Sequence, residues 1–287
     1  MITLRKDKAL PYFSTLVQTS SGFIKSALSD IGQIIRVTFG GISSICEDID
    51  KSNLMIMPDH VHFIINVKKT LEKHLGYYIG KLKGKCSRNV WNTFPQFEGL
   101  SVFENDFHDR IVMKNGQLKT LQDYLLDNPR RRWIKEHNPA LFQPRALFEI
   151  AGEKFRALGN ITLAEHFDIS AVRVSSKFSP EELQRRYNEW GSRIREAGVL
   201  AGAFISKAEK EIRDNALANS APIILLMDRP FPELYKPTGR WFDYCSLGLL
   251  LILAPYEAYP EGMGQRARFL NLNDKAEALA AGEWRRV

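Results

Sequence analysis

The sequence predicts an α/β protein of two domains, one spanning residues 1–145 and the other residues 146–287. Its 287 residues exceed one average domain and suit two. Regular strand–helix alternation is found only in the second half, and a proline-containing stretch at 137–147 separates the halves. A hydrophobic content of 44% and a charged content of 25% are ordinary for globular proteins, so the chain can bury a sizeable core.

The first half predicts a mixture of strands and helices. Residues 23–39 combine helical spacing with glycine punctuation. A Pro-Asp pair interrupts the apolar run 54–67, which indicates an edge, a bulge or a local break in that strand. Pro129 is expected to end the last helix. Strands are expected at 10–18, 54–67 and 101–113, and helices at 70–90 and 117–128.

The second half predicts a parallel sheet covered by helices on both faces, because nearly all-apolar strands alternate with helices. The most apolar run, 247–254, is far too short to span a bilayer and suits a buried strand. Strands are expected at 167–176, 199–205, 222–228 and 247–255, and helices at 179–198 and 206–220.

The formal charge of +7 is unevenly distributed. Residues 1–145 hold 21 basic and 14 acidic residues, whereas the remainder holds 19 of each. A basic domain beside a neutral one suggests a polyanionic partner for the first, although the excess charge could also serve only solubility.

Other features restrict the class of protein. The N-terminal residues lack the apolar segment of a signal peptide, and no membrane association is expected. Cys46, Cys86 and Cys245 form neither a metal-binding pair nor a disulfide scaffold, which fits a reducing cytoplasm. The chain has no GxxxxGK[ST] loop, so no nucleotide cofactor is expected.

His60 and His62 are the first candidate site residues. Side chains of a strand alternate between its faces, so two residues that are two apart point the same way. Val61 and Phe63 then point toward the core. Two neighbouring imidazoles can hold one divalent metal ion, although a bare His-x-His is also compatible with two half-exposed histidines without a ligand.

The second candidate lies on the helix expected at 117–128. Leu118, Leu121 and Leu125 form an apolar stripe, and Tyr124 and Asn128 are neighbours one turn apart at its edge. A phenol and a carboxamide therefore face one direction. Taken alone, the pair is more typical of a boundary tyrosine and a helix-ending asparagine before Pro129.

Together the two motifs resemble a known family. A hydrophobic-Pro-Asp-His-Val-His-hydrophobic strand about sixty residues before a Tyr-x-x-x-Asn-Pro helix is similar to the HUH single-tyrosine transposases. The segment 107–133, FHDRIVMKNGQLKTLQDYLLDNPRRRW, resembles the branch that includes the REP-associated tyrosine transposases. The resemblance covers roughly residues 8–140, whereas residues 19–52 depart from the family's usual second strand and helix.

The resemblance implies a ferredoxin-like antiparallel sheet with helices on one face. It implies that Tyr124 is the nucleophile and that His60, His62 and Asn128 are metal ligands. The implied metal is Mg²⁺ or Mn²⁺, the implied substrate is single-stranded or hairpin DNA, and the implied assembly is a homodimer. Tyrosine attack would leave a covalent phosphotyrosine that stores the bond energy for rejoining. The base that removes the phenol proton is open, with metal-bound hydroxide and His108 as candidates.

Basic residues of the same half are candidates for phosphate contacts, and neighbouring aromatics for base stacking. A solvated helix face and core aromatics are the alternatives. The candidate cations are Lys81, Lys83, Lys85, Arg88, Arg110, Arg130, Arg131 and Arg132. The candidate aromatics are Tyr77, Tyr78, Trp91 and Trp133.

Residues 168–256 more loosely resemble the Rossmann-like core of the DNA-processing protein A family. The order strand, helix, strand, Pro-x-x-Tyr-x-Pro loop, short helix and strand supports this likeness. Ligands of such sheets bind at the carboxyl ends of the strands, where Ser176, Lys177, Ser206 and Lys207 could hold a phosphate or a DNA backbone. An inert scaffold or a dimerisation module is the alternative for this neutral half.

Three functions remain open at this level. The first is a transposase that cleaves and rejoins single-stranded DNA. The second is a catalytically silent, domesticated DNA-hairpin-binding protein or repressor. The third is a metal-dependent nuclease that uses water, in which Tyr124 would only pack. The simultaneous presence of His60, His62, Tyr124 and Asn128 favours the first, because a pure binder does not need all four.

Overall fold

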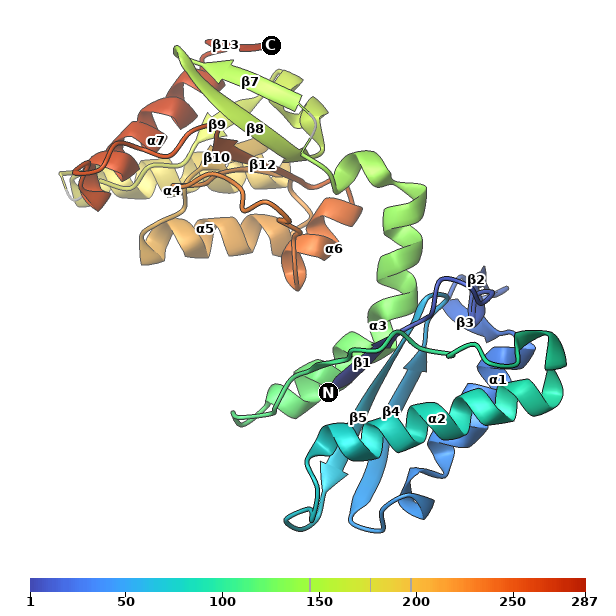
Figure 1. Ribbon diagram of the computed structural model, residues 1–287. Coiled ribbons are helices and arrows are strands. Elements are labelled where there is room, and N and C mark those ends of the chain that lie inside the picture. Colours follow the sequence, from blue (N-terminus) through green and yellow to red (C-terminus); the bar gives the residue numbers. More distant parts are fainter. Residues whose placement is uncertain (145, 176, 197) are drawn as a thin grey trace. The chain divides into compact units, whose positions relative to one another are not determined.

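The structure is a computed structural model that describes residues 1–144, 146–175, 177–196 and 198–287 (Figure 1). It divides into two compact units, Met1–Ile134 and Lys135–Val287. The division falls inside helix α3, Gln117–His137, earlier in the chain than the expected position 145. Within the described residues, no helix has the length and hydropathy needed to cross a bilayer.

The first unit is built on a four-stranded sheet with the order β4-β5-β1-β6, in which every neighbouring pair is antiparallel. A separate hairpin pairs β2 with β3. The strands are β1 (Ile2–Arg5), β2 (Ser14–Gln18), β3 (Ile24–Leu28), β4 (Ile49–Ile56), β5 (His60–Val67) and β6 (His108–Asp109). The helices before α3 are α1 (Asp30–Gly40) and α2 (Leu75–Thr93).

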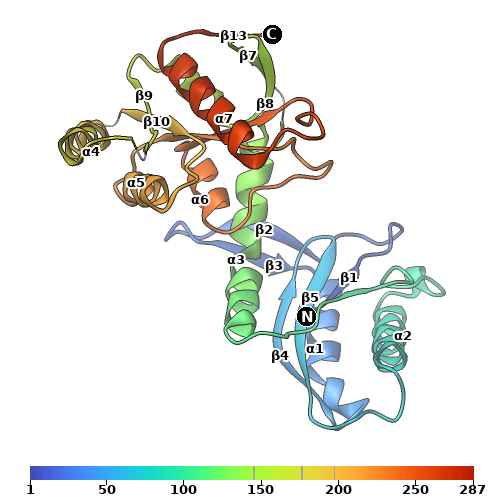
Figure 2. The same ribbon diagram turned by 90° about the vertical axis from the view of Figure 1, so that its left-hand side faces the viewer.

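The two faces of this sheet are covered differently. On one face, the α1 and α2 side chains pack with Val61 and Phe63 of β5 in the main core. On the other face, Leu121 and Leu125 of α3 pack on Ile64. Figure 2 shows α2 and α3 on opposite sides of the strands. The sheet order with α1 and α2 on one face is the ferredoxin-like arrangement that was expected, with α3 as an additional layer.

Several local predictions for this unit need correction. The run expected as one strand at 54–67 is a β4–β5 hairpin, because the main chain turns at Pro58-Asp59 and Met57 N donates to His60 O at 2.9 Å. Pro129 does not end α3, which continues to His137. Proline removes one helical hydrogen bond, but burial of Asn128, Pro129 and Arg131 against the rest of the unit holds the helix together.

The second unit contains a seven-stranded mixed sheet with the order β13-β7-β8-β12-β11-β10-β9. β9 to β12 are parallel to one another, as expected for this half, and β7, β8 and β13 extend the sheet with antiparallel pairs. The strands are β7 (Ala146–Ile150), β8 (Glu153–Gly159), β9 (Ile169–Ala171), β10 (Val199–Gly202), β11 (Ile223–Leu226), β12 (Leu250–Pro255) and β13 (Trp284–Arg286). The helices are α4 (Pro180–Arg195), α5 (Lys207–Ala218), α6 (Arg240–Ser246) and α7 (Gln265–Ala280).

Close approach of main chains fixes the start of α1. A Cβ atom added to Gly32 would lie 2.0 Å from the carbonyl oxygen of Phe13, whereas one added to Gly80 of α2 would meet nothing within 4 Å. We predict that Gly32→Ala lowers the free energy of unfolding by about 1–3 kcal/mol, because a backbone atom must move. Gly80→Ala should raise it by about 0.5–1 kcal/mol through helix propensity. Urea unfolding of both variants tests these two predictions. Equal changes in the free energy of unfolding would contradict the close contact between Gly32 and the Phe13 carbonyl.

Candidate active site

Strand β5 places two imidazoles side by side on the face of the sheet that α3 covers. The ring centroids of His60 and His62 lie 4.5 Å apart, with an angle of 72° between the ring planes. Val61 and Phe63, which alternate with them, are fully buried in the main core on the other face. The strand therefore anchors the unit with one set of side chains and presents the histidine pair with the other.

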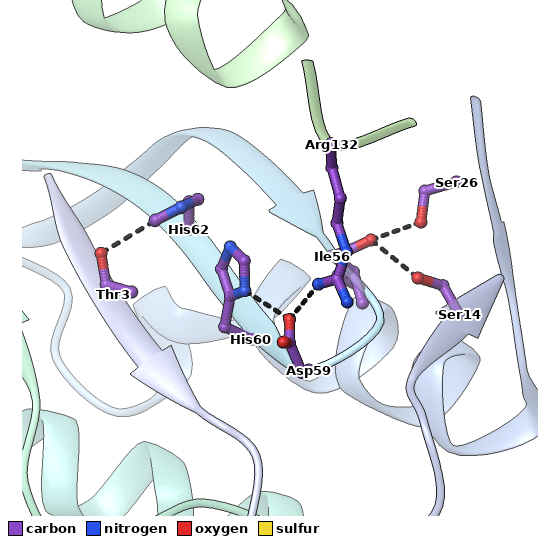
Figure 3. Close-up of polar contacts among 8 residues, drawn as sticks. All are labelled: Thr3, Ser14, Ser26, Ile56, Asp59, His60, His62 and Arg132. Carbon is purple, nitrogen blue, oxygen red and sulfur yellow. Dashed lines mark hydrogen bonds and ion pairs between the residues drawn. The ribbon is translucent and has the colours of Figure 1, made fainter. Parts of the chain in front are cut away.

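Both Nδ1 atoms of the pair have hydrogen-bond partners (Figure 3). His62 Nδ1 lies 2.8 Å from Thr3 Oγ1 on β1, which pairs with β5 in this register. His60 Nδ1 lies 2.7 Å from Asp59 Oδ1. Because a carboxylate only accepts, His60 Nδ1 carries the proton, and Nε2 is left with the lone pair that a metal ion needs.

The surroundings lower the pKa values of His62 and Asp59. Burial, reinforced by the neighbouring His60, lowers the pKa of His62 to about 4. The hydrogen bond from His60, with Arg132 close by, holds the pKa of the Asp59 carboxyl well below its usual range. At neutral pH, His62 is therefore a neutral imidazole and Asp59 is an anion.

Helix α3 brings the tyrosine to the same place. With Leu121 and Leu125 packed on Ile64, the ring centroid of Tyr124 lies 6.2 Å from that of His62. Tyr124 remains 42% exposed, so a large substrate can reach it. The histidine and the tyrosine come from the same chain in this arrangement.

Asn128 and Arg132 follow Tyr124 at successive four-residue steps on the same side of α3. Arg132 reaches back to Asp59 at the start of β5, so α3 runs antiparallel to the strand. Asn128, between the two contacts, is 9% exposed, and its Nδ2 atom has no hydrogen-bond partner among the described residues. A buried amide with an unpaired end is unusual and suggests a missing ligand.

The side chains present fit a divalent metal ion. Two imidazole nitrogens and, after a half-turn of the Asn128 amide, one carboxamide oxygen form a suitable donor set. The described residues contain no group of three or more His, Cys, Asp or Glu that could hold a metal ion, so in such a donor set Asn128 would supply the third donor.

The cations of α2 lie on the layer that covers the opposite face of the sheet from α3. Lys81 lies over the ring of Tyr77, 4.6 Å from its centroid. Lys83 donates to the carbonyl of Asn105 at 2.7 Å, and Lys85 donates to the Ser44 hydroxyl at 2.9 Å. The structure therefore does not gather the α2 cations, Lys81, Lys83, Lys85 and Arg88, beside Tyr124.

The remaining candidate cations lie on α3 or directly after β6. Arg130 and Arg131 pair with Asp127 within α3, and Arg132 pairs with Asp59. Arg110 follows β6. Thr3 of β1 pairs with His108 of β6 on one side and with His62 of β5 on the other. Directly paired residues share a face, so His108 lies on the site face, two strands from His62.

Sequence reasoning missed two residues of the site. The Pro-Asp pair signalled only a break in the strand, although Asp59 holds His60 and Arg132. Adjacency to His60 was the available signal. No signal in the sequence pointed to Thr3, because its contact with His62 depends on a pairing between distant strands.

The expected phosphate site of the second unit is differently arranged. Ser176 lies outside the described residues. Ser206 caps α5 and accepts from Glu209 N at 3.2 Å, and the Lys207 side chain is 93% exposed. The Lys177 amide donates to Ser175 Oγ at 3.1 Å.

A buried carboxylate occupies the amides at the start of α5. Glu209 is 3% exposed, and its oxygens accept from the backbone amides of Val174, Ile205 and Ser206 at 2.8–2.9 Å. The Ser206 amide is among the donors that an anion uses at a helix start. The structure therefore fills this position with the chain's own anion.

A ferredoxin-like sheet with a His-x-His strand facing a tyrosine-bearing helix is the arrangement expected of single-tyrosine transposases. Residues 40–128 match the family model described as transposase IS200 like. The matched segment includes both histidines, Tyr124 and Asn128, and the match bears out the resemblance inferred from the sequence for this segment.

Comparison with individual proteins adds little. No curated protein is significantly similar to the chain. One similar solved structure is a protein from Deinococcus radiodurans described as a transposase, with 14% sequence identity and a TM-score of 0.30. The match covers 45% of this chain and 87% of that chain.

The lowered pKa of His62 predicts a pH dependence of stability in metal-free protein. Between pH 6.5 and about 4 the unfolded state takes up a proton at this imidazole and the folded state does not. The free energy of unfolding should therefore fall as pH decreases through this window. Urea unfolding at a series of pH values, in the presence of a chelator, should show a smaller fall in the free energy of unfolding for His62→Gln than for the native protein. The same pH dependence in both proteins would contradict the burial of a neutral His62.

Proposed function

We propose that the first unit cleaves and rejoins single-stranded DNA, with Tyr124 as nucleophile and a divalent metal ion held by His60, His62 and Asn128. The observation that supports this most is the position of Tyr124 beside His62, on the face where both histidines have their Nδ1 atoms engaged. The match of residues 40–128 to the family model described as transposase IS200 like supports a role in DNA transposition.

The proposed reaction exchanges one ester bond of the DNA backbone for one ester bond to Tyr124. The Tyr124 oxygen forms a bond to the phosphorus of a DNA phosphodiester, and one phosphorus–oxygen ester bond breaks, so that the departing DNA oxygen takes up a proton. The result is a phosphotyrosine and a free DNA end. Rejoining reverses these bonds with a DNA hydroxyl as the attacking group, so no nucleotide is consumed.

The metal ion, Mg²⁺ or Mn²⁺, would polarise the phosphodiester and stabilise the charge that develops on it. The chain contributes orientation: Asp59 and Thr3 fix the imidazole rings, and packing of α3 holds the phenol in place. His108, on the same face of the sheet, remains a candidate for accepting the phenol proton.

The DNA partner is proposed to be single-stranded or hairpin DNA bound by a homodimer. The net charge of +7 on residues 1–145 supports a polyanionic partner. The arginines near the site, Arg110, Arg130, Arg131 and Arg132, remain candidates for phosphate contacts.

Covalent trapping tests this proposal. The full chain is incubated with Mn²⁺ and 5′- or 3′-labelled single-stranded hairpin oligonucleotides, and denaturing gels detect a protein–DNA adduct. We expect an adduct for the native protein and its complete loss for Tyr124→Phe, because the variant lacks the attacking oxygen while keeping the ring. Tyr77→Phe, an exposed tyrosine on α2, is the matched control and should retain the adduct.

The rival functions give different results in the same assay. Binding of the hairpin without an adduct would favour a catalytically silent DNA-binding protein or repressor. Cleavage that survives Tyr124→Phe would favour a nuclease that uses water. His62→Gln should abolish the adduct without abolishing DNA binding if the metal ion acts in the chemical step.

A further inference from the structure

The contacts around Asp59 join the tyrosine helix to the histidine pair. Asp59 Oδ1 accepts both from His60 Nδ1, at 2.7 Å, and from Arg132 Nη1 of α3 (Figure 3). We propose that Asp59 and Arg132 are positioning residues that couple the docking of α3 to the metal-binding tautomer of His60. This inference rests on the proposed function of the site.

The first step is the control of the tautomer. A neutral imidazole carries its proton on one of its two ring nitrogens. The hydrogen bonds that the surrounding groups make with the ring decide which nitrogen carries it. Asp59 can only accept, so it holds the proton on Nδ1 and leaves Nε2 as a lone pair. His60 has 22% of its side chain exposed, so without Asp59 water would compete for Nδ1 and permit the other tautomer.

The second step is the control of Asp59. Its carboxylate is 46% exposed and lies in the turn between β4 and β5, so it has room to rotate toward solvent. The Arg132 guanidinium, 24% exposed, meets the same oxygen that His60 uses. An ion pair at this oxygen restricts the carboxylate to the orientation in which it holds His60.

The third step is the position of Arg132 on α3. Tyr124 and Arg132 are eight residues apart, about two turns, and contact β5 and its preceding turn from the same side of the helix. Any movement that takes Tyr124 away from His62 as part of a rigid helix also withdraws Arg132 from Asp59. Docking of the nucleophile and preparation of the metal ligand therefore form one equilibrium, and their coupling must be reciprocal.

The chain offers a matched control for this ion pair. Lys119 and Asp123 form an exposed pair on the same helix, 3.4 Å apart, with side chains 81% and 61% exposed. Neither residue contacts the histidines or the tyrosine in any described interaction. Replacement of either residue alone changes the charge of α3 without touching the contacts of Asp59 with His60 and Arg132.

Metal binding gives the first measurement, with full-length protein and Mn²⁺ alone followed by electron paramagnetic resonance. Asp59→Asn should weaken Mn²⁺ binding by about 10–100-fold, as removal of a ligand's hydrogen-bond partner does. Arg132→Met and Arg132→Lys should weaken it by about 5-fold or more through the coupling, the lysine variant less than the methionine variant. Asp123→Asn and Lys119→Met should stay within about 2-fold of the native affinity.

Two further readouts separate positioning from a merely structural role. Nitrogen-15 NMR of metal-free protein should show His60 with its proton on Nδ1, and a shift toward the Nε2–H tautomer in Arg132→Met. Hydrogen exchange should show that Mn²⁺ protects the amides of α3 in the native protein and less so in Arg132→Met. Circular dichroism confirms that each variant is folded, and Arg132→Lys replaces Arg132→Met if the latter is not.

The outcomes are decisive in either direction. Native Mn²⁺ affinity and an unchanged His60 tautomer in the folded Arg132 variants would overturn the coupling. If the native protein binds Mn²⁺ but forms no DNA adduct, the proposed function fails, while the tautomer and exchange measurements still decide the coupling. If it binds no Mn²⁺, the NMR tautomer alone decides whether Arg132 positions His60.

Discussion

The packing of two leucines of α3 on Ile64 is the contact on which the site depends. Leu121 and Leu125 are almost fully buried there, apart from the larger core on the other face of the sheet. Burial of such a side chain contributes about 1.5–3 kcal/mol, so this contact holds the helix but is small beside the main core. The position of Tyr124 is therefore set by a limited patch, and polar contacts at the far end of the helix matter correspondingly more.

The alternation of side chains along β5 explains how structure and chemistry share one strand. Val61 and Phe63 anchor the strand in the core, and His60, His62 and Ile64 point to α3. A shift of register by one residue would bury both imidazoles in the core and expose the apolar pair. The hairpin turn at Pro58-Asp59 fixes this register, because Lys6 N donates to Asp59 O at 2.9 Å and Phe13 N donates to Pro58 O at 2.8 Å.

The sequence was sufficient for the parts of the fold that depend on local periodicity. The common face of His60 and His62 and the helical neighbourhood of Tyr124 and Asn128 follow from periods of 2 and 3.6 residues. The short strands β1 and β13 were not predicted, because pairing with distant partners, not propensity, makes them strands. Pro129 was wrongly expected to end the helix for a related reason. Tertiary burial of the surrounding turn outweighs the local cost of the proline.

The carboxylate of Glu209 has a consequence for what the second unit can accept. It sits on three backbone amides at the ends of β9 and β10, where open parallel sheets commonly receive nucleotides. A phosphate arriving from solution would compete with an anion that is covalently tethered and cannot diffuse away, and it would also meet like charge. At these three amides the tethered Glu209 carboxylate therefore disfavours the binding of a phosphate.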